Sequence, residues 1–578
     1  MRVRTILACA TLACVMLLAG SMAAQTFRGT ILGNVTDASG AVIPGASVKV
    51  HNVNTGQDRV TVTTADGTYA VPELPVGTYN VTITQKGFQT SVIKAVAVDV
   101  ASERRVDFAL KPGQVNEQVE VSGEVLPTIE TTNNTLGGVL TQETVKDLPI
   151  NGRDYTKLIF LNPGVAGSPD QITDSPGSFG EFSMNGARGR SNNYLLDGTD
   201  MNDGYRNDPA INQGGVFATP SAILPIDAVS DMRVLSNFEP EYGRNAGAVV
   251  NIVTKSGTNA LHGTAFEYFR NDALDARNYF DTTSVPKAPF HNNQFGGSVG
   301  GPIVKDKTFF FLDYEGQRES VGVVSLDCVP TLAQISAAQA AITGAGGAVS
   351  PIGQALVNFY PHDPNRYVSG ITSNDSGCFD ANGNFATDYI ANAPSLNNLS
   401  SVIAKIDHNF SQKDNISGRY FFGDSTQQFP LALNATGGQL PGYDTVTPTR
   451  VQLVSISNVT VLSPTKVNEL RYGWNRFAEG FFPQDRSFNP GSIGFCNVPV
   501  TFGTCNSQGL PIIILAPNAT GGAGFFSQLG ATSGDPRQRV DTNSQVIDNI
   551  SWKLNKHDIK FGGDFHRTSV EQSFDKYS

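Results

Sequence analysis

The sequence is poor in charged residues and in long apolar runs. Only 16% of its 578 residues are charged, against about 25% in an ordinary globular protein. Lys and Arg together number 41 against 52 Asp and Glu, so the formal net charge is −11. This excess of acidic residues argues against binding to nucleic acid or to anionic lipid through a basic face. Beyond residue 24, no run reaches the roughly 18 apolar residues of a membrane-spanning helix, which excludes helical spans.

Glycine and phenylalanine are abundant, with 59 Gly and 34 Phe against only 2 Trp. The polarity of the chain comes mostly from Asn, Ser, Thr, Gln and Gly, a composition typical of β-structure with many turns. At roughly 150 residues per domain, the length allows three or four domains, or fewer if one of them is a large barrel. The composition therefore predicts a folded, mainly β protein.

The first 24 residues have the layout of a secretory signal peptide. Arg2 and Arg4 precede an apolar stretch, and small residues follow at 21–24; the alternative is an uncleaved N-terminal anchor. Export permits disulfides among the four cysteines that remain. Chain order suggests the pairs Cys328–Cys378 and Cys496–Cys505, although four cysteines allow three pairings.

Residues 27–111 alternate β-branched and polar residues between turn signals, which predicts a small antiparallel sandwich. In "TYNVTITQKGF", Tyr79, Val81 and Ile83 share one face because successive side chains point to opposite sides of a strand. The blocks "GNVTDASGAVIPGASVKV" and "TTADGTYAVPELPVGTYNVTI" resemble the carboxypeptidase-regulatory-like domain. The resemblance implies an accessory module without catalytic residues that serves as a spacer or docking unit. Because related sandwiches can bind carbohydrate, a sugar-binding role is the alternative.

Residues 112–125 form a polar connector that contains the strand-like "EQVEVSGEV". A short extended segment of this kind could add to the sheet edge of a partner. The alternative is an ordinary last strand or a linker.

Three blocks after the connector carry the most specific signal. They are "DLPINGRDYTKLIFLNPGV" (147–165), "SMNGARGRSNNYLLDGTDMND" (183–203) and "IDAVSDMRVLSNFEPEYGRNAGAVVNIVTKSGTN" (226–259). They resemble the plug domain of TonB-dependent outer-membrane receptors, in the Oar-like branch, with Ala248 where many members have a second Gly. We therefore assign residues 126–256 to a plug of α+β type. The residues that carry its motifs are Asn151, Gly152, Arg153, Asn185, Gly186, Arg188, Asp197, Gly198, Tyr242, Gly243, Gly247, Asn251, Thr254 and Lys255.

The residues of the last block also predict local structure independently of the resemblance. Gly243 and Gly247 are expected to bracket a tight turn, since Gly tolerates positive φ. The apolar run at 248–253 predicts a strand buried on both faces. By resemblance, the segment between the sandwich and the plug would hold the TonB box, which an energy-transducing protein grips. Its candidate residues are Val119, Glu120, Val121, Ser122 and Gly123.

Residues 257–578 consist of strand-like runs of about ten residues whose connections alternate between tight and long. The tight connections are "VKDK", "SQKDN", "SPTK" and "NKHD". Short turns on one side and long loops on the other are the rule of a bacterial transmembrane β-barrel. Side chains also alternate: Leu470 and Tyr472 are apolar, whereas Glu469 and Arg471 are charged. This alternation predicts a lipid-facing outer surface and a wet lumen; a soluble sandwich is the alternative.

About nine strands can be counted, whereas a closed wall of a plugged outer-membrane transporter has roughly 22. An open edge in lipid leaves backbone groups unpaired. We therefore expect this sequence to be the N-terminal part of a longer barrel.

Two other motifs are given little weight. The G-x-S-x-G pattern at 296–300 falls inside a predicted barrel strand instead of a strand–helix turn, so it does not predict a nucleophile. Asp197, Asp200 and Asp203 have nearly calcium-loop spacing without the bidentate Glu, so we expect a solvated plug loop and no metal site.

By resemblance, the chain is expected to be a TonB-dependent outer-membrane receptor that binds an extracellular ligand and imports it, with its sandwich and plug on the periplasmic side and without catalytic residues or cofactor. The resemblance implies three partners: a TonB-type inner-membrane complex, outer-membrane lipid, and an extracellular ligand such as a carbohydrate, a peptide or a metal chelate. The alternative is a carbohydrate-binding or adhesion protein that does not transport.

Overall fold

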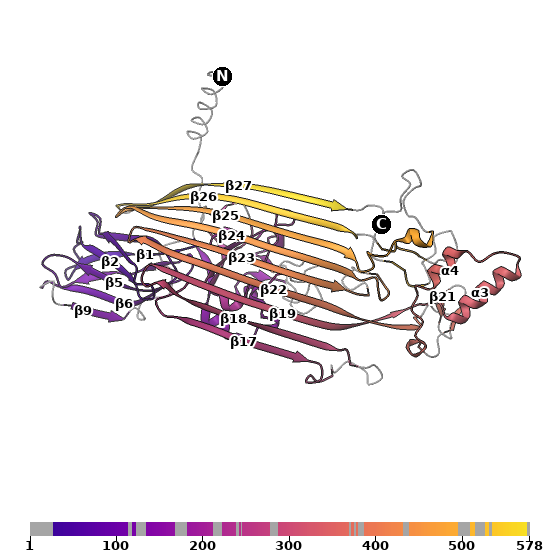
Figure 1. Ribbon diagram of the computed structural model, residues 1–578. Helices are drawn as coiled ribbons and strands as arrows, with labels where there is room; N and C mark the ends of the chain where they lie inside the picture. The colour runs from indigo at the N-terminus through magenta and orange to yellow at the C-terminus, as the bar shows by residue number, and fades with distance from the viewer. Residues whose placement is uncertain are drawn as a thin grey trace, which may run out of the picture.

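The computed structural model shows an N-terminal sandwich, a plug and a long curved sheet (Figure 1). The expected signal peptide lies outside the described residues. The structure describes residues 27–113, 118–122, 135–167, 182–211, 222–238, 242–243, 246–277, 287–368, 372–374, 377–379, 387–431, 438–494, 509–514, 526–530, 535–555 and 557–574.

The sandwich consists of two sheets that enclose one apolar core. One sheet has the order β4-β1-β7, with β8 also paired to β1, and the other has the order β3-β2-β5-β6-β9. Tyr79, Val81 and Ile83 all point into the core, as their alternation predicts. The strands are β1 (Gly29–Asp37), β2 (Ser47–Asn52), β3 (Asp58–Val62), β4 (Thr68–Leu74), β5 (Gly77–Thr84), β6 (Thr90–Val98), β7 (Glu103–Arg105), β8 (Phe108–Leu110) and β9 (Gln118–Ser122).

The plug is built on a five-stranded sheet of order β10-β15-β16-β13-β14, in which β13 and β16 are parallel. All six residues of β16 are buried, which confirms the strand predicted from the apolar run. Short helices connect the strands. The elements are β10 (Leu136–Thr141), α2 (Gln142–Asp147), η2 (Asn151–Arg153), η3 (Tyr155–Leu161), β11 (Val165–Ala166), β12 (Ser183–Met184), η4 (Gly189–Ser191), β13 (Asn193–Leu196), β14 (Thr199–Asp200), η5 (Ile226–Ala228), β15 (Val229–Asn237) and β16 (Val249–Thr254).

One detail of the predicted turn before β16 is wrong. The backbone of Gly247 is not in the positive-φ region; instead, a Cβ at this position would lie 2.5 Å from Oδ1 of Asn192. Asn192 accepts a hydrogen bond from the backbone N–H of Ala248 at 2.8 Å. Gly247 is therefore needed for close packing of the chain against Asn192.

The third unit is a nine-stranded antiparallel sheet whose strands follow chain order, with β17 and β27 at its two edges. Tight turns and long connections alternate as the sequence predicts. The strands are β17 (His262–Asn271), β18 (Phe290–Val304), β19 (Thr308–Asp327), β22 (Tyr389–Ser411), β23 (Asp414–Phe429), β24 (Thr445–Ser463), β25 (Lys466–Pro483), β26 (Arg537–Leu554) and β27 (His557–Phe574).

The strand lengths differ from the expected ten residues. Only β17 has ten, and β22 reaches 23. A membrane crossing requires about 9–11 residues, so hydrogen-bond pairing between neighbouring strands continues well past the apolar band. Strand segments outside the membrane need no apolar outer face, so they lack the alternation that marks a membrane-spanning strand. The sequence pattern therefore underestimates the length of the strands.

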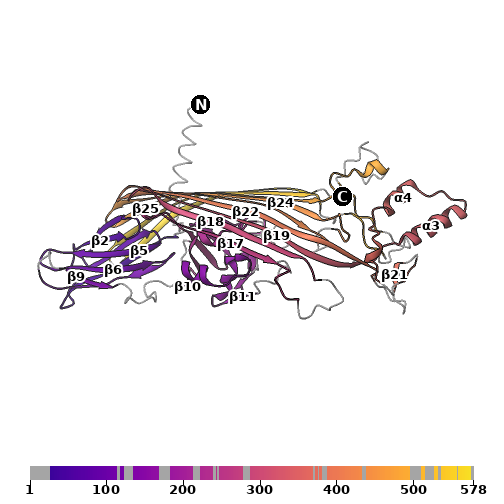
Figure 2. The ribbon, with the colours of Figure 1, turned by 60° about the horizontal axis from the view of Figure 1, so that its bottom comes forward.

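The two faces of this sheet differ as predicted. Leu470 and Tyr472 are exposed on the outer surface, while Glu469 and Arg471 are buried on the inner surface. The plug occupies the concave side, beneath the curved strands (Figure 2). Plug residues and inward side chains such as Ile403 share one apolar cluster.

The long connections fold together at the end of the sheet opposite the sandwich (Figure 1). A disulfide joins Cys328 to Cys378, with Cα atoms 5.7 Å apart, whereas Cys496 and Cys505 lie outside the described residues. The remaining elements here are α3 (Leu332–Gly344), α4 (Pro351–Val357), η7 (Pro364–Arg366), β20 (Thr372–Asn374), β21 (Gly377–Phe379) and η9 (Pro490–Ile493). Within the described ranges, no helix combines the length and apolarity that a membrane crossing requires.

The sandwich core leads to a stability prediction. Ile83 is fully buried, so Ile83→Ala should lower the free energy of unfolding by about 2–5 kcal/mol. Thr82→Val, on the opposite face of the same strand, should stay within about 0.5 kcal/mol of wild type. Urea unfolding of residues 27–122 measures both. Equal losses for the two variants would contradict the assignment of faces.

Candidate functional site

The contact between plug and barrel sheet is organised by a tight hairpin that joins β13 to β14. Asp197 and Gly198 occupy its two central positions with φ of 47° and 68°. Positive φ at both central residues defines a type I′ turn, which matches the twist of the flanking strands. The "LLDG" motif is therefore the tip of a plug hairpin, aimed at the inner wall of the barrel sheet.

Asp197 is buried at this tip and is paired with cations of the barrel sheet. Nη1 of Arg419 donates to Oδ2 of Asp197 at 3.0 Å, and Nζ of Lys405 lies 3.9 Å from Oδ1. Thr254 donates to the same carboxylate from its hydroxyl at 2.6 Å and from its backbone N–H at 2.8 Å.

These contacts determine the ionisation of Asp197. Burial alone would raise its pKa. The charges of Lys405 and Arg419, together with the hydrogen bonds from Thr254, outweigh burial and hold the pKa below its usual value of 3.8. Asp197 is thus a buried anion that links the plug to two barrel strands, β22 and β23.

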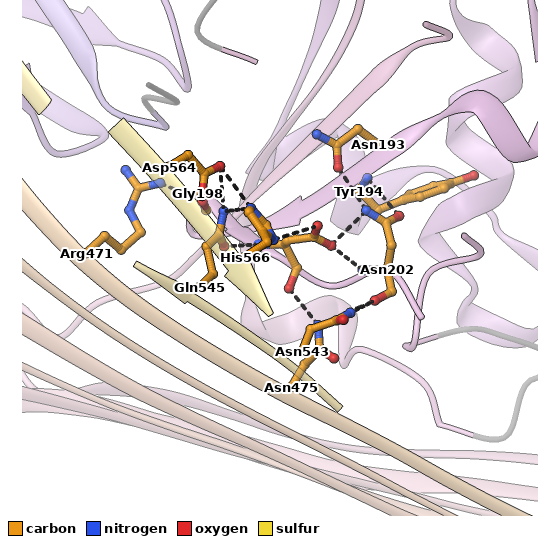
Figure 3. A network of polar contacts seen from close by, with 11 residues as sticks. Asn193, Tyr194, Gly198, Asn202, Arg471, Asn475, Asn543, Gln545, Asp564 and His566 are labelled. Carbon is orange, nitrogen blue, oxygen red and sulfur yellow. Dashed lines mark hydrogen bonds and ion pairs between the residues drawn. The ribbon is translucent and has the colours of Figure 1, made fainter. Parts of the chain in front are cut away.

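Beyond the tip, the hairpin is held by a polar network that reaches three further strands (Figure 3). Nδ2 of Asn475 donates to the carbonyl of Asp200 at 2.9 Å, and Nδ2 of Asn543 donates to the carbonyl of Asn202 at 2.7 Å. The backbone N–H of Asp200 in turn donates to Oε1 of Gln545 at 3.1 Å. Backbone groups of the plug are therefore satisfied by side chains of the barrel sheet.

The network also contains a histidine that lies beside two carboxylates (Figure 3). Nε2 of His566 lies 2.9 Å from Oδ2 of Asp564, and its Nδ1 lies 3.9 Å from Oδ2 of Asp200. These contacts extend the hold on the hairpin to β27.

A second ion-pair contact is made by Arg153 of the "NGR" motif. Its guanidinium donates to Asp227 of the plug at 2.9 Å and to Glu315 of β19 at 3.2 Å. It also lies 4.0 Å from the ring centroid of Phe266 on β17. Burial would lower the pKa of Arg153, but the charges of Glu315 and Asp227 raise it, so the guanidinium stays protonated.

The expectation of a solvated loop at the acidic cluster is wrong. Asp197, Asp200 and Asp203 are all buried, with exposed fractions of 5%, 3% and 1%. Oδ2 of Asp203 lies 4.0 Å from Nη2 of Arg539, which also contacts Glu479 at 3.2 Å. The spacing of three residues places the carboxylates along a docked hairpin, where barrel cations and amides compensate for the water they lose.

The other motif residues are spread over the plug. Gly152 has a φ of 74°, and its carbonyl accepts a hydrogen bond from Gln294 of β18 at 3.1 Å. Asn185 and Gly186 form a turn with positive φ, and Lys255 follows β16, where burial lowers its pKa. Gly243 and Arg188 lie in surface segments, whereas Tyr242 belongs to a small core cluster. Asn251 is fully buried in β16, and Asn151 is the first residue of η2.

The G-x-S-x-G pattern lies within β18, as predicted. Oγ of Ser298 is 2.8 Å from Oγ1 of Thr264 on the neighbouring strand. The serine is therefore part of a cross-strand pair and does not sit at a strand–helix turn.

The candidate TonB box coincides with a strand. β9 is the last strand of the sandwich and pairs in parallel with β6, with Val119 opposite Ser91. Oε2 of Glu120 accepts from Nζ of Lys94 at 2.6 Å, and both side chains are about half exposed. Gly123 lies outside the described residues.

Sequence reasoning missed the barrel partners of the plug: Glu315, Lys405, Arg419, Arg471 and Arg539. Each occupies an inward position of its strand. A charged residue at an inward position of a barrel strand is a signal in the sequence that the residue has a partner in the lumen. The pattern could not show which plug residue each one meets.

The comparison with protein families identifies the architecture. The model of the family described as "Outer membrane beta barrel domain" matches residues 253–578, and that described as "Carboxypeptidase regulatory-like domain" matches residues 30–111. The chain belongs to the outer membrane beta barrel domain family. The nine-stranded sheet is accordingly a barrel wall, and the protein is an outer-membrane protein.

Curated relatives agree with this assignment. The TonB-dependent transporter Oar of Myxococcus xanthus is 32% identical over 314 residues, which is 52% of this chain and 27% of that protein. The probable TonB-dependent siderophore receptor PirA of Acinetobacter baumannii is 28% identical over 172 residues, 29% of this chain and 21% of that protein. The matched parts thus span about a quarter of these relatives.

Among solved structures, the outer membrane transporter YddB of Escherichia coli matches with a TM-score of 0.45 and 13% identity. That match covers 75% of this chain and 48% of the transporter.

The buried pair at the hairpin tip predicts a large effect of one barrel substitution. Arg419→Met should weaken plug docking by about 3–5 kcal/mol, because it leaves the buried Asp197 carboxylate short of its nearest cation. Arg450→Met is a matched control, since Arg450 pairs with Asp424 at 2.8 Å on the exposed surface and should cost about 0–1 kcal/mol. The measurement is the urea concentration at which the plug becomes protease-sensitive. Similar midpoints for the two variants would contradict the role of the buried pair.

The ionisation of Asp197 predicts a pH dependence. Its pKa in the folded chain is below the usual 3.8, so its contribution to docking is fully present above that value and is lost as the pH falls through the folded pKa. Plug release should therefore become easier below about pH 4. Asp197→Asn should show a smaller acid-induced change than wild type in the same protease assay. An unchanged pH profile in this variant would assign the acid sensitivity to other groups.

Proposed function

We propose that this protein is a TonB-dependent receptor that imports an extracellular ligand through a plugged barrel. The observation that carries the proposal is the way the plug is held. Its hairpin docks against the inner barrel wall through ion pairs and amide hydrogen bonds, with Asp197 and Arg153 as the two anchors. Water can replace contacts of this type once an anchor is released, so the plug can move without unfolding the barrel.

Each of the three units has its own role in this proposal. Residues 27–111 form the periplasmic accessory sandwich, residues 126–256 the plug, and residues 257–578 a part of the barrel. The long loops at the far end, tied by the Cys328–Cys378 disulfide, capture the ligand. The names of the relatives, a transporter and a siderophore receptor, support import over enzymatic chemistry, and a metal chelate is one ligand class to test.

The segment Val119–Gly123 serves as the TonB box in this proposal. It lies on the connector between sandwich and plug, and its described part is already an extended strand at a sheet edge. An extended segment can pair with a strand of the periplasmic domain of an energy-transducing protein. Force on the connector would then reach the plug.

Deletion of Val119–Gly123 in the intact gene tests the proposal. Cells are given a defined mixture of metal chelates, peptides and oligosaccharides, and depletion of each compound from the medium is measured by mass spectrometry. We expect the deletion to reduce gene-dependent depletion at least tenfold, because force no longer reaches the plug.

A deletion of equal length, residues 38–42 of a sandwich turn, is the control, since all five residues are exposed and lie in the same module. Depletion at the wild-type rate without Val119–Gly123 would exclude energised import through this segment.

A further inference from the structure

The sandwich lies against the tight turns at one end of the barrel sheet (Figures 1 and 2). Oγ1 of Thr61 donates to the carbonyl of Pro464, in the turn between β24 and β25, at 2.5 Å. Oγ1 of Thr68 donates to the carbonyl of Asn555, in the turn between β26 and β27, at 3.1 Å. Two turns on one side of the barrel wall are thus in contact with the sandwich.

A third turn is contacted from the loop between β2 and β3 of the sandwich. The backbone N–H of Asn259 donates to the carbonyl of Asn54 at 3.0 Å. A Cβ added to Gly56 would lie 2.6 Å from Oδ1 of Asp306, in the turn between β18 and β19. The sandwich therefore spans the described barrel wall from β18 to β27.

The sandwich also reaches the plug. The ring of Phe27 lies 4.8 Å from the guanidinium of Arg471, whose Nη1 donates to the carbonyl of Gly198 at the hairpin tip. Phe27 and Val100 pack with Val253 of β16 in a small apolar cluster. The sandwich thus touches β16, which carries Thr254, and through Arg471 it is linked to the hairpin tip that carries Asp197.

A cavity of about 820 Å³ lies where the three units meet. Its wall includes Asn54 and Asp99 of the sandwich, Asp231 of the plug and Lys405 of the barrel. The cavity lies directly beside the plug anchor, because Lys405 is one of the cations of Asp197. The sandwich forms one wall of this space.

We propose that the sandwich is a gate: docked on the tight turns, it closes the exit of the barrel beneath the plug, and it must undock before a solute can leave the cavity. This inference rests on the proposed import function and adds its regulation. The energised segment is suited to the task, because β9 is hydrogen-bonded to β6 of the sandwich. Force on the candidate TonB box therefore acts on the sandwich as well as on the plug.

The interface has the character of a contact that opens. Its hydrogen bonds to the turns are single, and toward the plug it has an apolar cluster of three buried residues among those described and the hydrogen bonds of Arg233 to the carbonyls of Val100 and Ala101. Burial and the nearby charge of Asp99 in the sandwich raise the pKa of Asp231 in the plug to about 6, and both carboxylates line the cavity.

A reversible cross-link tests the gate in the full-length protein. Gly56→Cys with Asp306→Cys places two thiols at a contact where the added Cβ lies 3.3 Å from Cγ of Asp306, within the reach of a disulfide. Thr68→Cys with Asn555→Cys is a second pair on another turn. The control pair, His51→Cys with Asp58→Cys, joins facing residues of β2 and β3 inside the sandwich and leaves it free to move.

The readout is depletion of the same chelate, peptide and oligosaccharide mixture, before and after reduction with dithiothreitol. We expect either gate pair, when oxidised, to reduce gene-dependent depletion at least tenfold and reduction to restore it, while the control pair has no effect. Import at the wild-type rate with a gate pair fully cross-linked would overturn the gate and leave the import function standing.

If even the wild type depletes nothing, the import function fails, and the gate is judged by cross-link yield alone. In that case a yield severalfold lower in energised cells than in uncoupler-treated cells supports the gate, and equal yields overturn it.

Discussion

The structure depends on one requirement: a carboxylate that leaves water must be paired. Asp197 lies at the tip of a plug hairpin, and two barrel cations and Thr254 meet it there. Without these partners, burial would force the carboxylate to protonate or the hairpin to withdraw. The type I′ turn, the parallel pairing of β13 with β16 and the position of Thr254 at the end of β16 all place these groups at one point. The pair therefore fixes the plug in register with the wall.

The barrel wall supplies those partners as a consequence of its own constraint. In lipid every backbone group must be paired, so the strands pair along their length in an antiparallel register, which in the described sheet shifts only beside tight turns. That register sends alternate side chains inward, where charges such as Lys405 and Arg471 escape the lipid only if the lumen is filled or wet. The plug fills it and brings the opposite charges. Membrane insertion and plug docking are thus two results of the same alternation.

This division explains what the sequence could predict. Strand existence, tight turns and the inward or outward direction of side chains are local, and all follow from alternation along a few residues. Pairing across the plug interface is not local: Arg153 meets Glu315, 162 residues away. The cluster Asp197, Asp200 and Asp203 looked solvated because three carboxylates in seven residues normally are. Only the tertiary fold brings barrel cations and amides to them, and no spacing rule in the plug contains that information.

The contacts also suggest an order of events under force. Single hydrogen bonds, such as those of Thr61 and Thr68, hold the sandwich to the tight turns, and each contributes a net of about 0.5–1.5 kcal/mol. Breaking a buried ion pair by removing one partner costs about 3–5 kcal/mol, and the plug has two such pairs, Arg153–Glu315 and Asp197–Arg419, that must be released together. A pull on the connector therefore acts on the weaker, sequential contacts of the sandwich before it reaches the anchors at Asp197 and Arg153. The plug would then be released only after the wall beneath it has begun to open, which prevents a solute from being freed into a closed space.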